Sequence, residues 1–188
     1  MKKIKDFEKV EEAKDFKQIE PGPKLVKIVE VNDIEEKEYL EIKVDIASGE
    51  LKGDFNRRKE QFGDWPQQGI LRRSYKPQAL PFFKRFVVAV EKSNDGFKFD
   101  FDEQKLVGKL FIANFGIEEY DNGEEIKESI KIQEARSIQS YKEGKIQIPK
   151  PKTLPQKDHE KYISNTNHKT NDPDSLSGMD IDSEDLPF

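Results

Sequence analysis

Residues 24–46 read KLVKIVEVNDIEEKEYLEIKVDI, and this stretch decides the fold class of the 188-residue chain. Its first part, Lys24–Val31, is rich in aliphatic and β-branched residues, which is typical of a strand. A polar turn follows at Asn32–Lys37, and Tyr39–Ala47 then alternates polar and apolar side chains, as in a strand with one buried face. The chain next turns toward a third strand, which we expect near Glu50–Phe55. These segments predict an antiparallel three-stranded meander.

The period of the apolar residues changes after this meander. Residues 56–76 follow no regular pattern and are expected to be irregular. From Pro77, apolar residues recur at helical spacing as far as Val90, which predicts a helix. Leu106–Phe115 and Glu128–Ser140 predict two more strands, with an Asn-Gly turn signal between them. Three strands, a helix and two strands match the connectivity of the five-stranded OB barrel, so we expect a mainly β fold of this kind with one or two helices.

Composition sets the outer limits of this domain. Charged residues make up 38% of the chain and hydrophobic residues 34%, which predicts a modest core. From Pro149 onward prolines are frequent and apolar residues are scarce, so we expect a disordered tail over residues 149–188. Apolar residues at roughly helical spacing predict a short helical extension over residues 1–19, which leaves residues 20–148 for the barrel.

The same composition excludes several classes of protein. The chain has no cysteine, which excludes disulfides, thiolate catalysis and cysteine-based metal sites. We see neither a signal-peptide pattern nor an apolar run of membrane-spanning length, so we expect a cytoplasmic protein. Both histidines, His159 and His168, fall in the expected tail, which excludes a Ser/His triad on the folded domain. We therefore expect no enzyme activity, no metal and no cofactor, although carboxylates at residues 100–103 and 118–121 leave a metal-dependent nuclease as an alternative.

The charges are distributed unevenly along the chain. Residues 51–86 carry nine Lys or Arg and three Asp or Glu, a net charge of +6 in a chain whose net charge is −5. Such a basic block is typical of a localised site for a polyanion. Aromatic residues are interleaved with the cations, and single-stranded nucleic acid needs both, because cations neutralise phosphates while flat rings stack on bases. The residues that we expect to contact DNA are Phe55, Arg57, Arg58, Phe62, Trp65, Arg72, Arg73, Tyr75 and Lys76.

Each aromatic residue has a core role that competes with this binding role. Phe55 ends an expected strand and is open to either role. Trp65 and Tyr75 lie among polar loop residues and are the strongest candidates for stacking on bases. Three others recur at helical spacing and are expected in the core, namely Phe82, Phe83 and Phe86.

The chain ends on an acidic and then apolar peptide. Its last 17 residues contain six Asp or Glu and no Lys or Arg. A terminal Pro-Phe after acidic residues is a compact ligand, because its ring fills an apolar pocket while basic groups of a partner hold the carboxylates. The acidic tail also opposes the basic block in charge, so we expect it to compete with DNA for that block. The residues expected to bind a partner are Asp182, Glu184, Asp185, Leu186, Pro187 and Phe188.

This ending resembles the acidic tip of bacterial single-stranded DNA-binding proteins, which recruits replication, recombination and repair enzymes. It reads Leu-Pro-Phe where Ile-Pro-Phe is commoner, a mild departure that should keep the pocket contact. The body resembles phage-encoded single-stranded DNA-binding proteins of Gram-positive hosts. The matching residues are Glu11–Phe16 with Pro21-Gly22, Ser74–Leu80 with Phe82–Phe86 and Glu91–Asn94, and Leu106–Lys109 with Phe115-Gly116 and Glu118–Tyr120.

The resemblance implies an OB fold, sequence-independent binding of single-stranded DNA and a role in phage replication or recombination. The sequence thus predicts a protein that coats and protects single strands in the cytoplasm of a bacterial host and recruits partner enzymes through its tip. One alternative is an interaction protein that uses the tail as bait for host repair enzymes, and the nuclease is the other. The oligomeric state, the length of DNA bound and the choice between DNA and RNA stay open, because stacking and phosphate contacts serve both nucleic acids.

Overall fold

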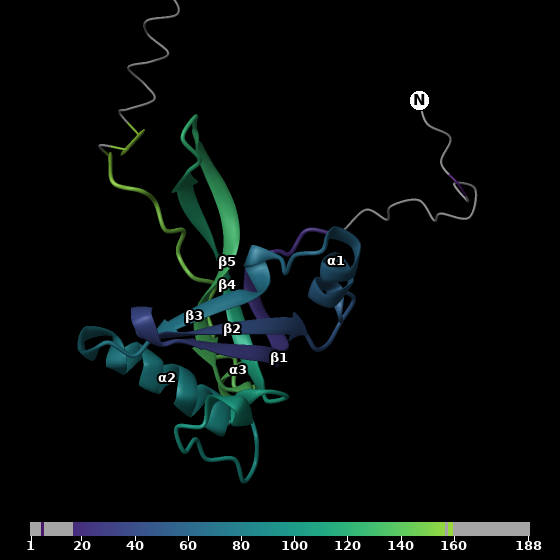
Figure 1. Ribbon diagram of the computed structural model, residues 1–188, viewed down its shortest axis with the longest axis vertical. Helices are drawn as coiled ribbons and strands as arrows, with labels where there is room; N and C mark the ends of the chain where they lie inside the picture. Colours follow the sequence, from purple (N-terminus) through teal and green to yellow (C-terminus); the bar gives the residue numbers. More distant parts are fainter. Residues whose placement is uncertain (1–4, 6–16, 157, 160–188) are drawn as a thin grey trace, which may run out of the picture. The chain divides into compact units, whose positions relative to one another are not determined.

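The strand predicted over residues 24–31 is the central strand, β1, of one antiparallel five-stranded sheet (Figure 1). The computed structural model describes residue 5, residues 17–156 and residues 158–159 of the chain. In the sheet the strands follow the order β3-β2-β1-β4-β5. Their bounds are β1 (Gly22–Ile34), β2 (Tyr39–Ile46), β3 (Ile70–Ser74), β4 (Leu110–Asp121) and β5 (Ile126–Arg136).

The alternation of apolar residues in β2 correctly predicts which side of the sheet is buried. Every second side chain from Leu40 to Ile46 lies in the core. β2 pairs with β1 on one side and with β3 on the other, both antiparallel, and the β1 ladder shifts register between Ile28 and Glu30. The face opposite the core is therefore built from the polar residues of β2 and their neighbours.

The prediction of a strand at Glu50–Phe55 is wrong, because the helix α1 (Asp54–Phe62) begins there. The carboxylate of Asp45, at the end of β2, accepts a hydrogen bond of 3.0 Å from the backbone N–H of Phe55. This bond satisfies a donor in the first turn of the helix from a residue that lies ten positions upstream. The prediction that residues 56–76 are irregular is wrong as well, since they contain the rest of α1 and the third strand, β3.

The predicted helix after Pro77 is confirmed as α2 (Leu80–Glu91). It buries Phe86 in the core, where its ring meets Phe111 of β4 edge to face at 5.7 Å between centroids. The last strand is shorter than its pattern predicts, because the short helix α3 (Ile138–Lys142) follows it. The Ser137 hydroxyl caps α3 by accepting a hydrogen bond from a backbone N–H in its first turn.

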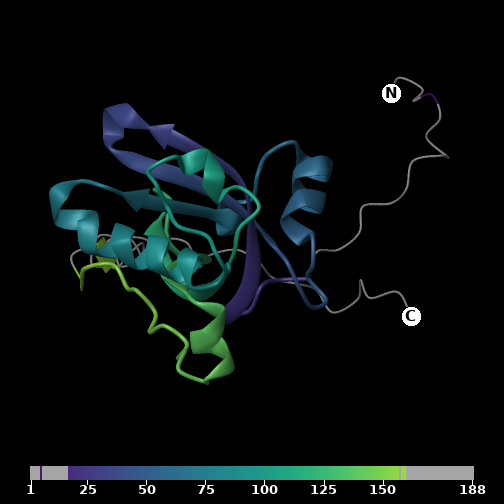
Figure 2. The ribbon, with the colours of Figure 1, turned by 90° about the horizontal axis from the view of Figure 1, so that it is seen from below.

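The sheet is consistent with an OB-like barrel, but it is not closed. Its edge strands are β3 and β5, and the Arg73 side chain reaches from one to the other, donating to the backbone carbonyl of Gln133 at 3.4 Å. Helices α1 and α2 lie at opposite ends of strands β2 and β3 (Figures 1 and 2). The open seam between β3 and β5 is thus on the side of the sheet where α2 packs against β3.

The described residues form two compact units. One consists of the chain up to Glu118 together with Glu128–Lys152, and the other of Glu119–Lys127 together with residues from Thr153 onward. Lys152 forms a parallel bridge with Glu118, so the first unit includes the start of the segment that the sequence assigns to the tail.

The two predicted terminal segments fall mostly on residues that are not described. Residues 17–19 have no regular secondary structure, and the rest of the predicted N-terminal helix, apart from Lys5, lies outside the described residues. Residues 160–188, with the acidic tip, also lie outside them. Within the described part of the chain, no helix has the length and apolarity needed to cross a membrane.

Candidate nucleic-acid interface

The nine residues expected to contact DNA lie in three parts of the structure rather than in one continuous loop. Some lie on or just after α1, two lie on β3, and two follow it. In that order they are Phe55, Arg57, Arg58 and Phe62 on α1, Trp65 after it, Arg72 and Arg73 on β3, and Tyr75 and Lys76 after β3.

Phe55 belongs to the core and not to the interface. Its side chain is 0% exposed, and its ring centroid lies 6.5 Å from that of Phe115 on β4. A base cannot reach this ring, so of the two roles that the sequence leaves open the structure shows the core role. Phe62, at the other end of α1, is exposed and remains a candidate.

The arginine pair on α1 is largely occupied by the protein itself. Arg58 is 17% exposed, forms an ion pair of 2.7 Å with the buried carboxylate of Asp54, and donates to the backbone carbonyl of Lys17. It anchors the helix, so only a small part of its side chain is open to a phosphate. Arg57 is half-exposed and donates to the Lys52 carbonyl at 2.7 Å, which leaves part of its guanidinium open to solvent.

Trp65 is held in a fixed orientation at the end of the sheet. Its indole N–H donates to the carbonyl of Gly69 at 3.2 Å, and its half-buried ring packs on the core. Gly69 leaves room for this ring, since a Cβ at that position would lie 2.6 Å from the indole nitrogen. The ammonium group of Lys59 lies 5.8 Å from the ring centroid, within range of a cation–π interaction.

Two further cations, on β3 and β2, are paired with carboxylates of the neighbouring strands. Arg72 forms an ion pair with Glu41 at 2.8 Å, and Lys43 forms one with Glu30 at 2.8 Å. Hydrogen bonds from Lys43 and Asn32 hold the pKa of Glu30 below its ordinary value, and the nearby charge of Lys59 lowers it further. Lys59 thus lies close to the indole and within electrostatic range of Glu30 on β1. We call the set of Lys43, Lys59, Trp65 and Arg72 the Trp65 face.

Tyr75 lies at the junction between β3 and α2. Its hydroxyl donates to the Asp33 carboxylate at 2.8 Å, and its ring meets Phe83 edge to face at 6.2 Å. The bond to Asp33 raises the pKa of Tyr75 to about 12. Tyr75 is partly buried, so less of its ring is open to a base than the sequence suggests. Lys76, also half-buried, accepts at its backbone carbonyl from the turn that starts α2.

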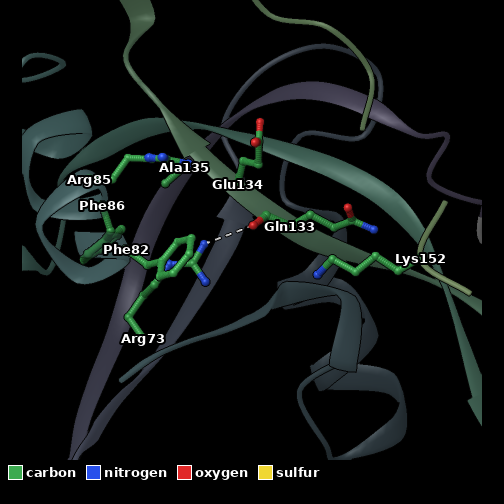
Figure 3. A pocket seen from close by; sticks show the side chains of 8 residues that line it. All are labelled: Arg73, Phe82, Arg85, Phe86, Gln133, Glu134, Ala135 and Lys152. Atoms are coloured by element: carbon green, nitrogen blue, oxygen red, sulfur yellow. Dashed lines mark hydrogen bonds between the residues drawn. The ribbon is translucent and has the colours of Figure 1, made fainter. Parts of the chain in front are cut away.

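Arg73 lies apart from the Trp65 face, at the seam between β3 and β5. It lines a cavity of about 350 Å³ together with Phe82 and Arg85 of α2, Gln133 and Glu134 of β5, and Lys152 (Figure 3). Phe82 is 60% exposed, so the expectation that it belongs to the core is wrong. It lies four residues before the buried Phe86, and only the position of α2 at the edge of the sheet distinguishes the two rings.

The carboxylates considered for a nuclease are engaged with cations. Asp100 and Asp102 both pair with Lys105, and Glu118 pairs with Lys131 and Lys152. Within the part of the chain that the structure describes, no group of three or more His, Asp or Glu could hold a metal ion.

Comparison of the chain with protein-family models and with curated proteins finds no match. The features that bear on function are therefore the fixed indole, the cations around it and the cavity at the seam.

Proposed function

We propose that this protein binds single-stranded DNA without sequence preference, through the Trp65 face. The observation that supports this most strongly is the indole itself, held by Gly69 on one edge and flanked by Lys59. A flat ring with fixed orientation beside cations is the combination that single-strand binding uses, because every base has a face that can stack.

The energies favour a single strand even though the cations already have partners. The ion pair of Arg72 with Glu41 lies at the surface, where such a pair is worth about 0–1 kcal/mol, whereas the pair of Lys43 with Glu30 is partly buried. Stacking a base on an aromatic ring is worth about 1–3 kcal/mol, and phosphate contacts add the release of counterions. In a duplex the faces of the bases are covered by their neighbours, so the indole has nothing to stack on.

The proposal extends to the role that the sequence suggests. Coating of single strands in phage replication or recombination, with recruitment of partner enzymes by the acidic tip, rests on the resemblance and on residues 182–188, which lie outside the described part of the chain. The nuclease is the weaker alternative, because Asp100 and Asp102 are paired with Lys105.

The experiment that tests this function is a titration of tryptophan fluorescence, since Trp65 is the only tryptophan. Oligo-dT and a duplex of equal length are added at two salt concentrations. We expect strong quenching by oligo-dT alone, and weaker quenching at higher salt. No response to either ligand, together with no retention of oligo-dT in a filter assay, would overturn the proposal. Cleavage of the oligonucleotide in the presence of magnesium would support the nuclease instead.

A further inference from the structure

The open seam of the sheet leaves a cleft with charged walls. It lies between the edge strands β3 and β5, beside α2, and all of its lining residues belong to one compact unit. Figure 3 shows Arg73 reaching from β3 toward the Gln133 carbonyl on β5, with Phe82 and Arg85 on α2 and Lys152 on the far side. We call this site the seam cleft.

Arg73 lines this cleft beside the Glu134 carboxylate, with which it forms no ion pair. Its guanidinium donates to the backbone carbonyls of Arg72 and Gln133, and it forms no ion pair with any described residue. Burial lowers its pKa to about 10, which Glu134 opposes and Arg85 reinforces. The carboxylate of Glu134 is itself held by Arg136 at 3.0 Å. A half-buried guanidinium in this position gains from an anion that enters the cleft.

Phe82 and Arg85 supply the other two groups that a nucleotide needs. The Arg85 guanidinium lies 5.7 Å from the centroid of the exposed Phe82 ring, and it has no carboxylate partner among the described residues. The cavity volume of about 350 Å³ is near the lower end of the range for small-ligand sites, roughly 300–1,000 Å³. That volume suits one nucleotide unit and is too small for a base pair with its backbone.

We propose that the seam cleft binds one nucleotide of a single strand, with its phosphodiester between Arg73 and Arg85 and its base against Phe82. This inference rests on the proposed function and adds a second contact to it. Arg72 and Arg73 are neighbours on β3. Arg72 belongs to the Trp65 face and pairs with Glu41, whereas Arg73 faces the seam. A strand bound at both places passes around the edge strand β3.

The decisive test compares two charge removals one residue apart on α2, in the full-length protein. Arg85→Met removes a cation of the cleft, and Lys84→Met removes an exposed cation that does not line it. Binding of oligo-dT is measured over a range of salt. We expect Arg85→Met to weaken binding on the order of tenfold and to reduce the salt slope by about 0.7, whereas Lys84→Met changes affinity by less than about twofold.

Two further variants separate the charge of the cleft from its shape. Phe82→Leu keeps an apolar group on the helix and removes the ring, and we expect a loss of roughly fivefold to a hundredfold. Arg73→Lys keeps the charge but loses the planar fork of donors, so a loss is expected there too. Melting curves of each variant establish that it is folded.

A second measurement locates the base directly. An oligo-dT that carries 5-iododeoxyuridine is photocrosslinked to the protein, and the modified peptide is identified by mass spectrometry. Crosslinking at Phe82 that decreases in Arg85→Met supports the proposal. Free thymidine monophosphate tests whether the ligand of the cleft is a nucleotide within a strand or a free nucleotide. Tight binding of the free mononucleotide at the cleft would overturn the proposal.

The failure of this inference differs from failure of the proposed function. If oligo-dT binds and quenches Trp65, but Arg85→Met matches Lys84→Met and no crosslink forms at Phe82, the seam cleft is not a subsite and single-strand binding stands. If the unaltered protein does not bind oligo-dT, both proposals are wrong.

Discussion

Gly69 and Trp65 fit together so closely that no side chain can be accommodated between them. The indole N–H donates to the Gly69 carbonyl at 3.2 Å, and a Cβ on Gly69 would lie 2.6 Å from the indole nitrogen and 2.7 Å from the ring of Phe55. The residue that orients the proposed stacking platform is thus a glycine between that platform and the core.

Gly69→Ala is expected to displace the indole. Overpacking of this kind costs about 1–3 kcal/mol, so the melting temperature should fall and the tryptophan emission should shift as the ring changes surroundings. We also expect weaker binding of oligo-dT. The neighbouring Gln68→Ala shortens a half-buried side chain and leaves Gly69 unchanged, so it serves as the control. Unchanged emission and affinity in Gly69→Ala would show that the indole is not held as described.

Arg58 and Arg57 should differ in their effect on stability although they are neighbours. Arg58→Ala leaves the buried Asp54 carboxylate without its ion pair of 2.7 Å, which is expected to lower the free energy of unfolding by about 3 kcal/mol. Arg57→Ala removes a longer and more exposed contact of 3.5 Å to Asp54 together with an exposed hydrogen bond of 2.7 Å to the Lys52 carbonyl, and should cost about 1 kcal/mol. Urea denaturation of both variants measures the difference, and equal losses would contradict the assignment.

Arg72 is expected to contribute to the salt dependence of binding. Arg72→Met should weaken binding of oligo-dT and reduce the slope of log affinity against log salt by about 0.7, since one phosphate contact is lost. Lys142→Met, on α3 and outside both the Trp65 face and the seam cleft, removes the same charge as a control. If the slope falls equally in both variants, the effect comes from the net charge of the protein and not from a contact between Arg72 and a phosphate.

The Tyr75 phenol is expected to ionise late in an alkaline titration. Its hydrogen bond to Asp33 favours the neutral form in the folded protein, so its pKa rises from 10 to about 12. This group therefore stabilises the fold fully below pH 10, and the contribution is lost as the pH rises through about 12. Asp33→Asn should shift the late part of the tyrosinate absorbance to lower pH. Tyr141→Phe, which removes an exposed tyrosine, should leave that late part in place.

Removal of residues 172–188 tests the expected competition between the tail and DNA. These residues carry six acidic groups and no Lys or Arg, so the truncated protein should bind oligo-dT more tightly at low salt. The gain should disappear at high salt, where such interactions are screened. Equal affinity of the full-length and truncated proteins for oligo-dT at low salt would show that the tail does not compete with DNA.

The elements that the sequence predicts correctly are those whose signals are local. The alternation in Tyr39–Ala47 is visible residue by residue because one face of β2 is buried along its length. Helix α1 is different: no side chain of its own N-cap residue caps it, and a backbone N–H of its first turn donates instead to Asp45, on another element. The sequence does not predict β3, because this strand has only five residues and two of them are arginines.

For the candidate site, too, the sequence predicts the residue types but not which side chains are buried. The sequence identifies Trp65 and Arg72 by their type and by the charge around them, and the structure leaves Arg72 exposed and Trp65 half-buried. It cannot show that Phe55 is buried, or that Phe82 is exposed beside Arg73, because helical spacing places Phe82 and Phe86 on similar sides. These outcomes depend on where α1 and α2 meet the sheet, which is a tertiary property.

The open seam also bears on how the chain behaves at high concentration. An edge strand with unpaired backbone groups is a template on which another chain can add a strand, and natural proteins discourage this with short edges and charged side chains. β3 is such an edge, only five residues long, and Arg72 and Arg73 are adjacent in it. A second copy that paired with β3 would have to accommodate both guanidinium groups. The charge of these two arginines thus works against the pairing of a second copy with this edge.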